Sequence, residues 1–207
     1  SSAASDVYKR KNEQVLIPRP DTETWLEKVI QYYRNETGLK VADLGTGSGA
    51  ILVGFLYYCR DAVGVGVDIS TEALKIAEEN GQNLKITDRV EWRQGDYLKA
   101  FDEEDIFDGI FSNPPYIPTK DIGGLSREVK HEPRLALDGG TDGLYFYHLL
   151  AKGAAEHLKP GGFLAVEFGI GQATDILEMF RKSAQYEDFE VIKDYGGIER
   201  ALYCRKK

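Results

Sequence analysis

Long apolar runs and cysteines are scarce in this 207-residue sequence. No apolar run approaches the ~18 residues that a bilayer-spanning helix needs, and the first five residues contain neither a basic region nor an apolar core, so we expect no secretory signal and no membrane partner. Cys59 and Cys204 lack the spacing of metal ligands, and two scattered thiols are typical of a reducing compartment. We therefore expect no metal site and a cytoplasmic location, or an organellar one if the N-terminus has been trimmed.

An excess of basic residues is also absent. Lys and Arg number 26 against 34 Asp and Glu, which gives a formal net charge of −8. Proteins that bind nucleic acids usually carry a basic surface that neutralises phosphates, so the acidic balance argues against a stable nucleic-acid partner. A local basic patch can still exist within an acidic total, and the charge therefore lowers this possibility without excluding it.

Length and composition predict one globular domain. The hydrophobic fraction of 42% and the aromatic fraction of 11% are ordinary for a folded chain and argue against disorder of the whole. Residues 1–14 are polar and lack periodicity, so they are expected to form a disordered tail or a truncated linker. Residues 15–207 are long enough for a single α/β domain, which we expect to be a monomer.

Strand-like and helix-like segments alternate along this domain. We expect helices over residues 21–37, 50–56, 70–80, 143–158 and 170–184, and strands over residues 41–44, 62–68, 90–92, 109–111, 163–168, 189–193 and 200–204. Such alternation predicts a mostly parallel sheet with helices on both faces and ligands at the carboxyl ends of the strands. Gly196-Gly197 is too short for a parallel crossover, so the last two strands must be antiparallel. A seven-stranded, mostly parallel sheet with one antiparallel strand resembles the Rossmann-like fold of class I S-adenosylmethionine-dependent methyltransferases.

The sequence Asn113-Pro114-Pro115-Tyr116 follows the fourth predicted strand and carries the main chemical hypothesis. The prolines fix the backbone and have no N–H, so Asn113 Oδ1 and the Pro114 carbonyl can accept both hydrogens of a flat NH₂ group without a competing donor. Tyr116 adds an aromatic face. Two fixed acceptors orient the nitrogen for attack on an electrophilic carbon. The alternative is a strand-ending Pro-Pro turn with an Asn cap.

A glycine-rich turn after the first strand predicts the cofactor. Its third glycine comes one residue earlier than in a dinucleotide fingerprint, and an acid precedes the turn, where it would repel a pyrophosphate and favour a cation such as S-adenosylmethionine. Acids that end the next two strands could then hold the ribose and the adenine, although a simple turn and a helix cap are the alternatives. The predicted cofactor residues are Asp43, Gly45, Thr46, Gly47, Ser48, Gly49, Asp68, Ile69, Asp96, Tyr97 and Asn113.

Six segments together resemble one family, the release factor glutamine N5-methyltransferases of the HemK/PrmC type. They are VLIPRPDTE at 15–23, DLGTGSGAI at 43–51, FDGIFSNPPYI at 107–117, EPRLAL at 132–137, GGTDGL at 139–144 and EFGIGQ at 167–172. The resemblance implies that a methyl group passes from S-adenosylmethionine to the glutamine amide in the Gly-Gly-Gln loop of a peptide-chain release factor. It implies a class I methyltransferase fold and a protein partner.

Site residues also carry over by motif. Asn113, Pro114, Pro115 and Tyr116 are expected to bind and orient the amide, and Glu132 and Arg134 to order the loop at 117–142 near the substrate. A surface ion pair is the alternative for Glu132 and Arg134.

This sequence departs from the family at two places. The family usually has Trp or Phe where Tyr97 stands, so only the ring contact is carried over, and no role follows for Arg19. Family members also usually have a helical domain before this point, which leaves the affinity for the protein substrate open.

Two other functions remain as hypotheses at this point. A nucleic-acid N-methyltransferase can hold the exocyclic amine of adenine or guanine with the same Asn-Pro-Pro-Tyr sequence, but the net acidity and the Glu-Pro-Arg segment at 132–134 argue against it. A non-catalytic domain that binds an adenosine cofactor, or a protein-interaction domain, is the second, and the intact sequence from Asn113 to Tyr116 argues against it.

Overall fold

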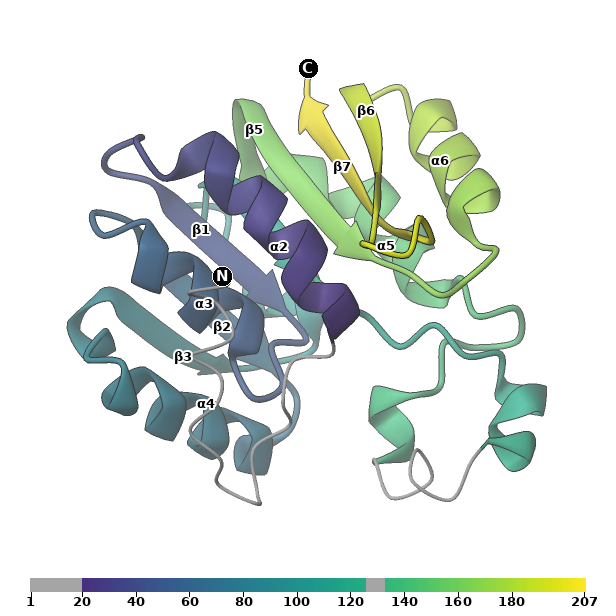
Figure 1. Cartoon of the computed structure of the whole chain (residues 1–207), viewed down its shortest axis with the longest axis horizontal. Coiled ribbons are helices and arrows are strands. Elements are labelled where there is room, and N and C mark those ends of the chain that lie inside the picture. Colours follow the sequence, from purple (N-terminus) through teal and green to yellow (C-terminus); the bar gives the residue numbers. More distant parts are fainter. Residues whose placement is uncertain (1–19, 126–132) are drawn as a thin grey trace.

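The computed structural model describes residues 20–125 and 133–207, which form a seven-stranded sheet with the strand order β3-β2-β1-β4-β5-β7-β6 (Figure 1). The predicted tail at 1–14 lies outside the described residues. The strands are β1 (Lys40–Leu44), β2 (Val63–Asp68), β3 (Val90–Gln94), β4 (Phe107–Ser112), β5 (Leu158–Glu167), β6 (Tyr186–Lys193) and β7 (Glu199–Lys206).

Helices cover both faces of the sheet, as the alternation predicts (Figure 1). The α-helices are α2 (Pro20–Tyr33), α3 (Ala50–Tyr58), α4 (Thr71–Asn83), α5 (Tyr145–Gly153) and α6 (Ala173–Lys182). Short 3-10 helices are η1 (Thr87–Arg89), η2 (Tyr97–Ala100), η3 (Thr119–Gly124), η5 (Arg134–Ala136) and η6 (Ala154–His157). Figure 1 shows α2, α3 and α4 on the near face, and α5 and α6 cover the opposite face. No helix in the two described ranges is long and apolar enough to cross a membrane.

The strand directions confirm the predicted fold class. β1 runs parallel to β2 and β4, β2 is parallel to β3, and β4 is parallel to β5. Only β7 is reversed, and it pairs in antiparallel fashion with β5 and with β6. The carboxyl ends of the parallel strands therefore meet along one edge of the sheet, where α/β proteins bind their ligands.

The region from α5 to β5 differs from the prediction. The helix expected over 143–158 ends at Gly153 and continues only as η6, and β5 begins at Leu158 instead of Phe163. Leu158 pairs with Phe107 and the next pair is Gly109 with Phe163, so the Pro160-Gly161-Gly162 segment is an irregularity inside the strand. Gly161 has a φ of 74°, a conformation that glycine adopts without strain. These residues interrupt a strand and do not end a helix.

Aromatic packing fixes β4, the strand that leads to Asn113. Phe111 is fully buried, and its ring lies 6.3 Å from Trp25 of α2, 5.0 Å from Phe55 of α3 and 5.2 Å from Phe163 of β5, measured between centroids. Gly109 provides the space for the Phe163 ring, because a Cβ at this position would lie 2.1 Å from two of its ring atoms. This contact requires glycine at residue 109.

We expect Gly109→Ala to lower the free energy of unfolding by about 1–3 kcal/mol, because an added methyl group would overfill the core. Urea unfolding of the variant and the original protein measures the difference. Gly123→Ala is the control, since a Cβ there meets no atom within 4 Å, and its effect should stay within about 0.5 kcal/mol. Equal stability of the Gly109→Ala and Gly123→Ala variants would contradict this account of the packing.

Candidate active site

A cavity of about 160 Å³ opens at the carboxyl edge of the sheet, between the glycine turn after β1, the end of β4 and the start of α2. It brings together two predicted groups, the glycine turn and the Asn-Pro-Pro-Tyr segment. The residues that line it are Thr22, Gly45, Thr46, Gly47, Ser48, Ala50, Ile51, Asn113, Pro114, Tyr116, Ile117, Ala136, Leu137 and Glu167.

Asn113 lies at the wall of this cavity and not in the core. The preceding residue, Ser112, pairs with Leu44 of β1 and with Val166 of β5, and its Oγ donates a hydrogen bond of 2.8 Å to the Leu44 carbonyl. This bond ties the end of β4 to the start of the glycine turn. Asn113 is partly exposed, whereas Pro114 behind it is buried. The polar side chain is therefore presented at the cavity by a rigid backbone.

Small residues and one glutamine hold the backbone of Pro115 and Tyr116. A Cβ at Gly139 would lie 2.8 Å from the Pro115 carbonyl oxygen, and one at Gly143 would lie 2.4 Å from the Tyr116 carbonyl oxygen. Gln172 Nε2 donates to the same Tyr116 oxygen at 3.0 Å. The expected long loop after Tyr116 thus returns to pack against it, and only glycine allows so close an approach.

Hydrogen bonds to acids near the ends of β1 and β2 fix the conformation of the glycine turn. Thr46 Oγ1 donates to Asp43 Oδ2 at 2.6 Å, and the Gly47 N–H donates to Asp68 Oδ2 at 2.8 Å. Gly45, Gly47 and Gly49 have φ values of 70°, 56° and 77°, which place the turn in the region that favours glycine. A Cβ at Gly47 would meet no atom within 4 Å, so the backbone there faces open space.

Two buried oxygen atoms beside this turn, Asp43 Oδ1 and Tyr97 Oη, make no hydrogen bond of normal geometry within the described residues. The Leu52 backbone approaches the Asp43 carboxyl group, and the Ser112 side chain approaches the Tyr97 hydroxyl group. Asp43 is fully buried, and burial raises the pKa of its carboxyl to about 7. The Tyr97 hydroxyl lies beneath Gly45, 2.8 Å from where a Cβ would stand. Buried polar atoms normally have partners, so both oxygens are suited to a ligand or an ordered water.

Tyr97 is held in an uncommon conformation. Its φ is 51°, which non-glycine residues rarely adopt, and its ring stacks on Phe146 of α5 with 4.6 Å between centroids. Asp96 beside it is exposed and pairs with Lys99 at 2.5 Å. Of these two predicted adenine contacts, Tyr97 lies close to the glycine turn, whereas Asp96 stands at the surface.

Asp68 accepts two backbone hydrogen bonds at the end of β2. Its Oδ2 accepts from Gly47 and its Oδ1 accepts from the Ser70 N–H at 2.9 Å. Ser70, not Asp68, caps α4 by accepting from the Ala73 N–H. Ile69 is 54% exposed at the same edge of the sheet. The acid therefore links the end of β2 to the glycine turn.

Arg134 does not line the cavity. It lies in η5 and pairs with Asp138 at 3.4 Å, with a side chain that is 71% exposed, while Ala136 and Leu137 of the same segment do face the cavity. Its predicted partner Glu132 lies outside the described residues, as does Arg19. Within the described residues, Arg134 thus forms an ion pair with a near neighbour, Asp138, which lies four positions further along the chain.

Glu167 is a cavity residue that the sequence did not single out by itself. It ends β5, is 3% exposed, and its Oε2 accepts from Thr22 Oγ1 at 2.5 Å and from Trp25 Nε1 at 2.8 Å. The available signal is an acid at the end of an otherwise apolar predicted strand, inside the segment EFGIGQ. A buried carboxyl group costs free energy unless it is hydrogen-bonded, and the bonds from Thr22 and Trp25 offset that cost here.

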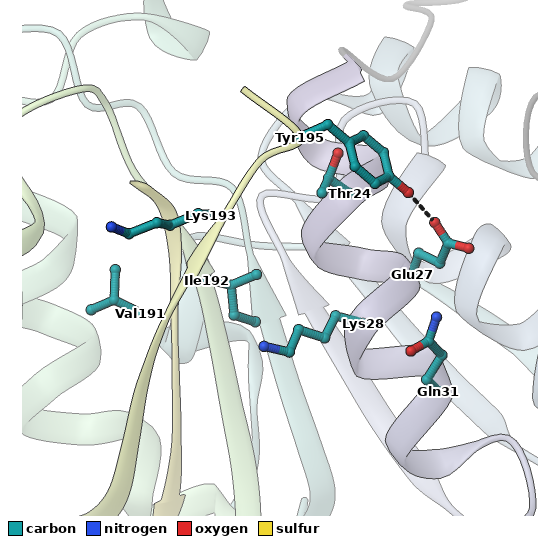
Figure 2. Close-up of a pocket in the computed structure, with 8 residues that line it drawn as sticks. All are labelled: Thr24, Glu27, Lys28, Gln31, Val191, Ile192, Lys193 and Tyr195. Carbon is teal, nitrogen blue, oxygen red and sulfur yellow. Dashed lines mark hydrogen bonds between the residues drawn. The ribbon is translucent and has the colours of Figure 1, made fainter. Parts of the chain in front are cut away.

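A second hollow, of about 480 Å³, lies between α2 and β6 and contains none of the predicted site residues. Figure 2 shows Tyr195 reaching across it to α2, where its hydroxyl donates to Glu27 at 2.8 Å. Lys28 in the same hollow pairs with Glu190 of β6. The strand-end residues that the sequence predicts do not line this surface, so we place the active site in the smaller cavity.

Comparison with known proteins shows the family to which the chain is similar. A family model described as a methyltransferase domain matches residues 35–167. The release factor glutamine methyltransferase of Bradyrhizobium diazoefficiens is 44% identical over 201 residues, which cover 95% of this chain and 67% of that protein. The corresponding protein of Moorella thermoacetica is 42% identical over 193 residues, which cover 93% of this chain and 68% of that protein.

The fold is shared more widely than the sequence. A methyltransferase from Pyrococcus furiosus superposes with a TM-score of 0.68 at 21% identity, covering 95% of this chain and 87% of that one. This likeness concerns the fold alone, whereas the two relatives above are similar in sequence over nearly the whole chain. The chain spans about two thirds of the length of those relatives and belongs to the release factor glutamine methyltransferase family.

Proposed function

We propose that this chain transfers a methyl group from S-adenosylmethionine to the side-chain amide nitrogen of a glutamine in a peptide-chain release factor. The observation that supports it is one cavity lined on one side by the glycine turn and on the other by Asn113 and Pro114. A methyl donor on the turn and an amide on the acceptors would then face each other across a short gap. Such pre-orientation removes much of the entropic cost of the reaction.

The residues beside the turn suit S-adenosylmethionine, which when bound supplies an electrophilic methyl group on a cationic sulfur. Asp43 Oδ1 lies beside the turn and lacks a hydrogen bond of normal geometry within the described residues, so we assign it to the amino group of the methionine part. Gly45 and Gly47 allow the backbone to approach the ligand, with Thr46, Ser48 and Gly49 completing the turn. Asp68 and Ile69 would hold the ribose, and Asp96 and Tyr97 the adenine.

The opposite wall suits the glutamine amide. Asn113 Oδ1 and the Pro114 carbonyl would each accept one hydrogen of the NH₂ group, because neither proline carries a competing N–H. Pro115 fixes the direction of the Pro114 carbonyl, and Tyr116 packs beside the glutamine side chain. No protein group needs to remove a proton beforehand, since the methylated nitrogen becomes acidic and can release a proton to water. We retain Glu132 and Arg134 as residues that order the neighbouring loop.

The remaining features of the function are proposals of the same kind. We take residues 15–207 as the catalytic domain and 1–14 as a tail or linker. The cytoplasmic location and the monomeric state stay predictions. A nucleic-acid amine is the alternative substrate. The chain has 34 acidic and 26 basic residues, and this net negative charge argues against it.

Incubation with a purified release factor and S-adenosylmethionine tests the function. We expect mass spectrometry to find one added methyl group, located by fragmentation on the glutamine of the Gly-Gly-Gln loop. Parallel reactions with tritiated donor and DNA or RNA should leave the nucleic acid unlabelled. Label in nucleic acid with none in the release factor would reject the proposed substrate in favour of the alternative.

Asn113→Ala should lower kcat by roughly 100- to 1,000-fold, the usual effect of removing one oriented group that acts in the transition state. The affinity for S-adenosylmethionine should be largely kept, which calorimetry measures separately. Asn83→Ala is the control, because Asn83 is exposed at the last position of α4, away from the cavity. Near-normal turnover of Asn113→Ala would refute the role of this side chain.

The affinity for S-adenosylmethionine should depend on Asp43 ionisation. Burial raises the pKa of this carboxyl to about 7, so it is mostly neutral below that pH and mostly charged above it. Because the charged form attracts a cation, the affinity should rise about tenfold between about pH 6 and pH 8. Titration of the original protein and Asp43→Asn at several pH values measures this. The same pH dependence in both proteins would show that another group is responsible.

A further inference from the structure

Glu167 is placed beside the predicted attacking nitrogen by strand register. Ser112 of β4 pairs with Val166 of β5, so Asn113 and Glu167 are the next residues on two neighbouring strands. Adjacent strands lie about 5 Å apart. Both side chains line the same cavity, together with Pro114 and Thr22.

The Glu167 carboxyl group is an acceptor that two donors hold in place. Thr22 Oγ1 and Trp25 Nε1 both donate to Oε2, at 2.5 Å and 2.8 Å. Hydrogen bonds donated to a carboxyl group favour its ionised form. Trp25 is fully buried and Thr22 is 4% exposed, so the donors cannot easily turn away. The carboxyl group is thus held at the end of β5 before any substrate arrives.

Methyl transfer to an amide moves positive charge. The nitrogen lone pair forms the new N–C bond, the electron pair of the S–C bond stays on sulfur, and the positive charge of the sulfonium passes to the nitrogen. The nitrogen keeps both hydrogens through this step and loses one to water afterwards. A fixed negative charge on the nitrogen side of the cavity favours the transition state over the bound ground state, because the positive charge approaches it as the bond forms.

We propose that Glu167 acts electrostatically in methyl transfer, by stabilising the positive charge that develops on the substrate nitrogen held by Asn113 and Pro114. This inference rests on the proposed function and assigns a part of the reaction to a carboxylate on a different strand from the Asn-Pro-Pro-Tyr segment. Thr22 and Trp25 serve as positioning residues, since they act through the carboxylate.

Two substitutions separate the charge from the hydrogen bonds. Glu167→Gln has almost the same shape and keeps an acceptor oxygen for Thr22 and Trp25, but it lacks the charge. Glu167→Asp keeps the charge, while its shorter side chain withdraws from both donors. If the charge matters, kcat should fall about 100-fold in Glu167→Gln, and Glu167→Asp should retain clearly more activity than Glu167→Gln. The Michaelis constant for S-adenosylmethionine should change little in either variant.

Glu190→Gln is the matched control. Glu190 also bonds to α2, through Lys28 and Tyr32, but it lies on β6 and does not line the cavity. This variant should keep the original kcat. Thermal unfolding of all variants identifies any that fail to fold, and binding of S-adenosylhomocysteine shows whether the cofactor side is intact.

Two outcomes would overturn the proposal. The first is a kcat of Glu167→Gln within about threefold of the original, which corresponds to less than about 0.7 kcal/mol in activation free energy. The second is a lower kcat in Glu167→Asp than in Glu167→Gln, which would mean that the hydrogen bonds to α2 matter and the charge does not. Both outcomes are judged only after the original protein has been shown to methylate its release factor. Failure of the proposed function would therefore appear first, in the original protein and not in the variants.

Discussion

The parallel pairing of β1 with β4 is the constraint on which the site depends. Leu44 and Ser112 are register partners and are also joined by the Ser112 hydroxyl, so the glycine turn and Asn113 leave the sheet side by side. In the proposed function, neither segment would form a site by itself. The turn would hold the cofactor and offers no acceptor for an amide, whereas Asn113 and Pro114 would accept from the amide and hold no methyl donor. Their adjacency is a property of strand order, which places β4 next to β1 although β2 and β3 come between them in sequence.

Local signals account for the parts of this arrangement that the sequence predicted. In β1, β2 and β4, a short run of apolar residues and glycines leads to a polar or glycine residue at the strand end or directly after it. The glycines at 196–197 required an antiparallel final pair, as the structure shows. The turn and Asn113 could be proposed because glycine permits backbone conformations that other residues avoid and proline fixes them, and both residue types are read directly from the sequence. These features depend on neighbours only a few positions away.

The features that sequence reasoning missed depend on distant contacts. Glu167 is fixed by Thr22, 145 residues earlier in the chain, and no local pattern indicates that partner. The start of β5 was misplaced because Lys159-Pro160-Gly161-Gly162 resembles a helix terminator, while pairing of Leu158 with Phe107 makes it part of a strand. Gly139 and Gly143 looked like loop residues, yet each leaves space for a carbonyl of the Pro115-Tyr116 backbone. Tertiary contacts, not local preference, decide these positions.

The unpartnered oxygens beside the glycine turn connect stability with ligand affinity. A buried polar atom without a partner costs about 1–3 kcal/mol, and Asp43 Oδ1 and Tyr97 Oη are two such atoms among the described residues. Apolar replacements would remove this cost and stabilise the free protein, but they would also remove the acceptors that a cationic ligand needs. In the proposed function, donors on the cofactor would satisfy these oxygens and so favour the bound state. The strained backbone of Tyr97, with its φ of 51°, lies at the same place.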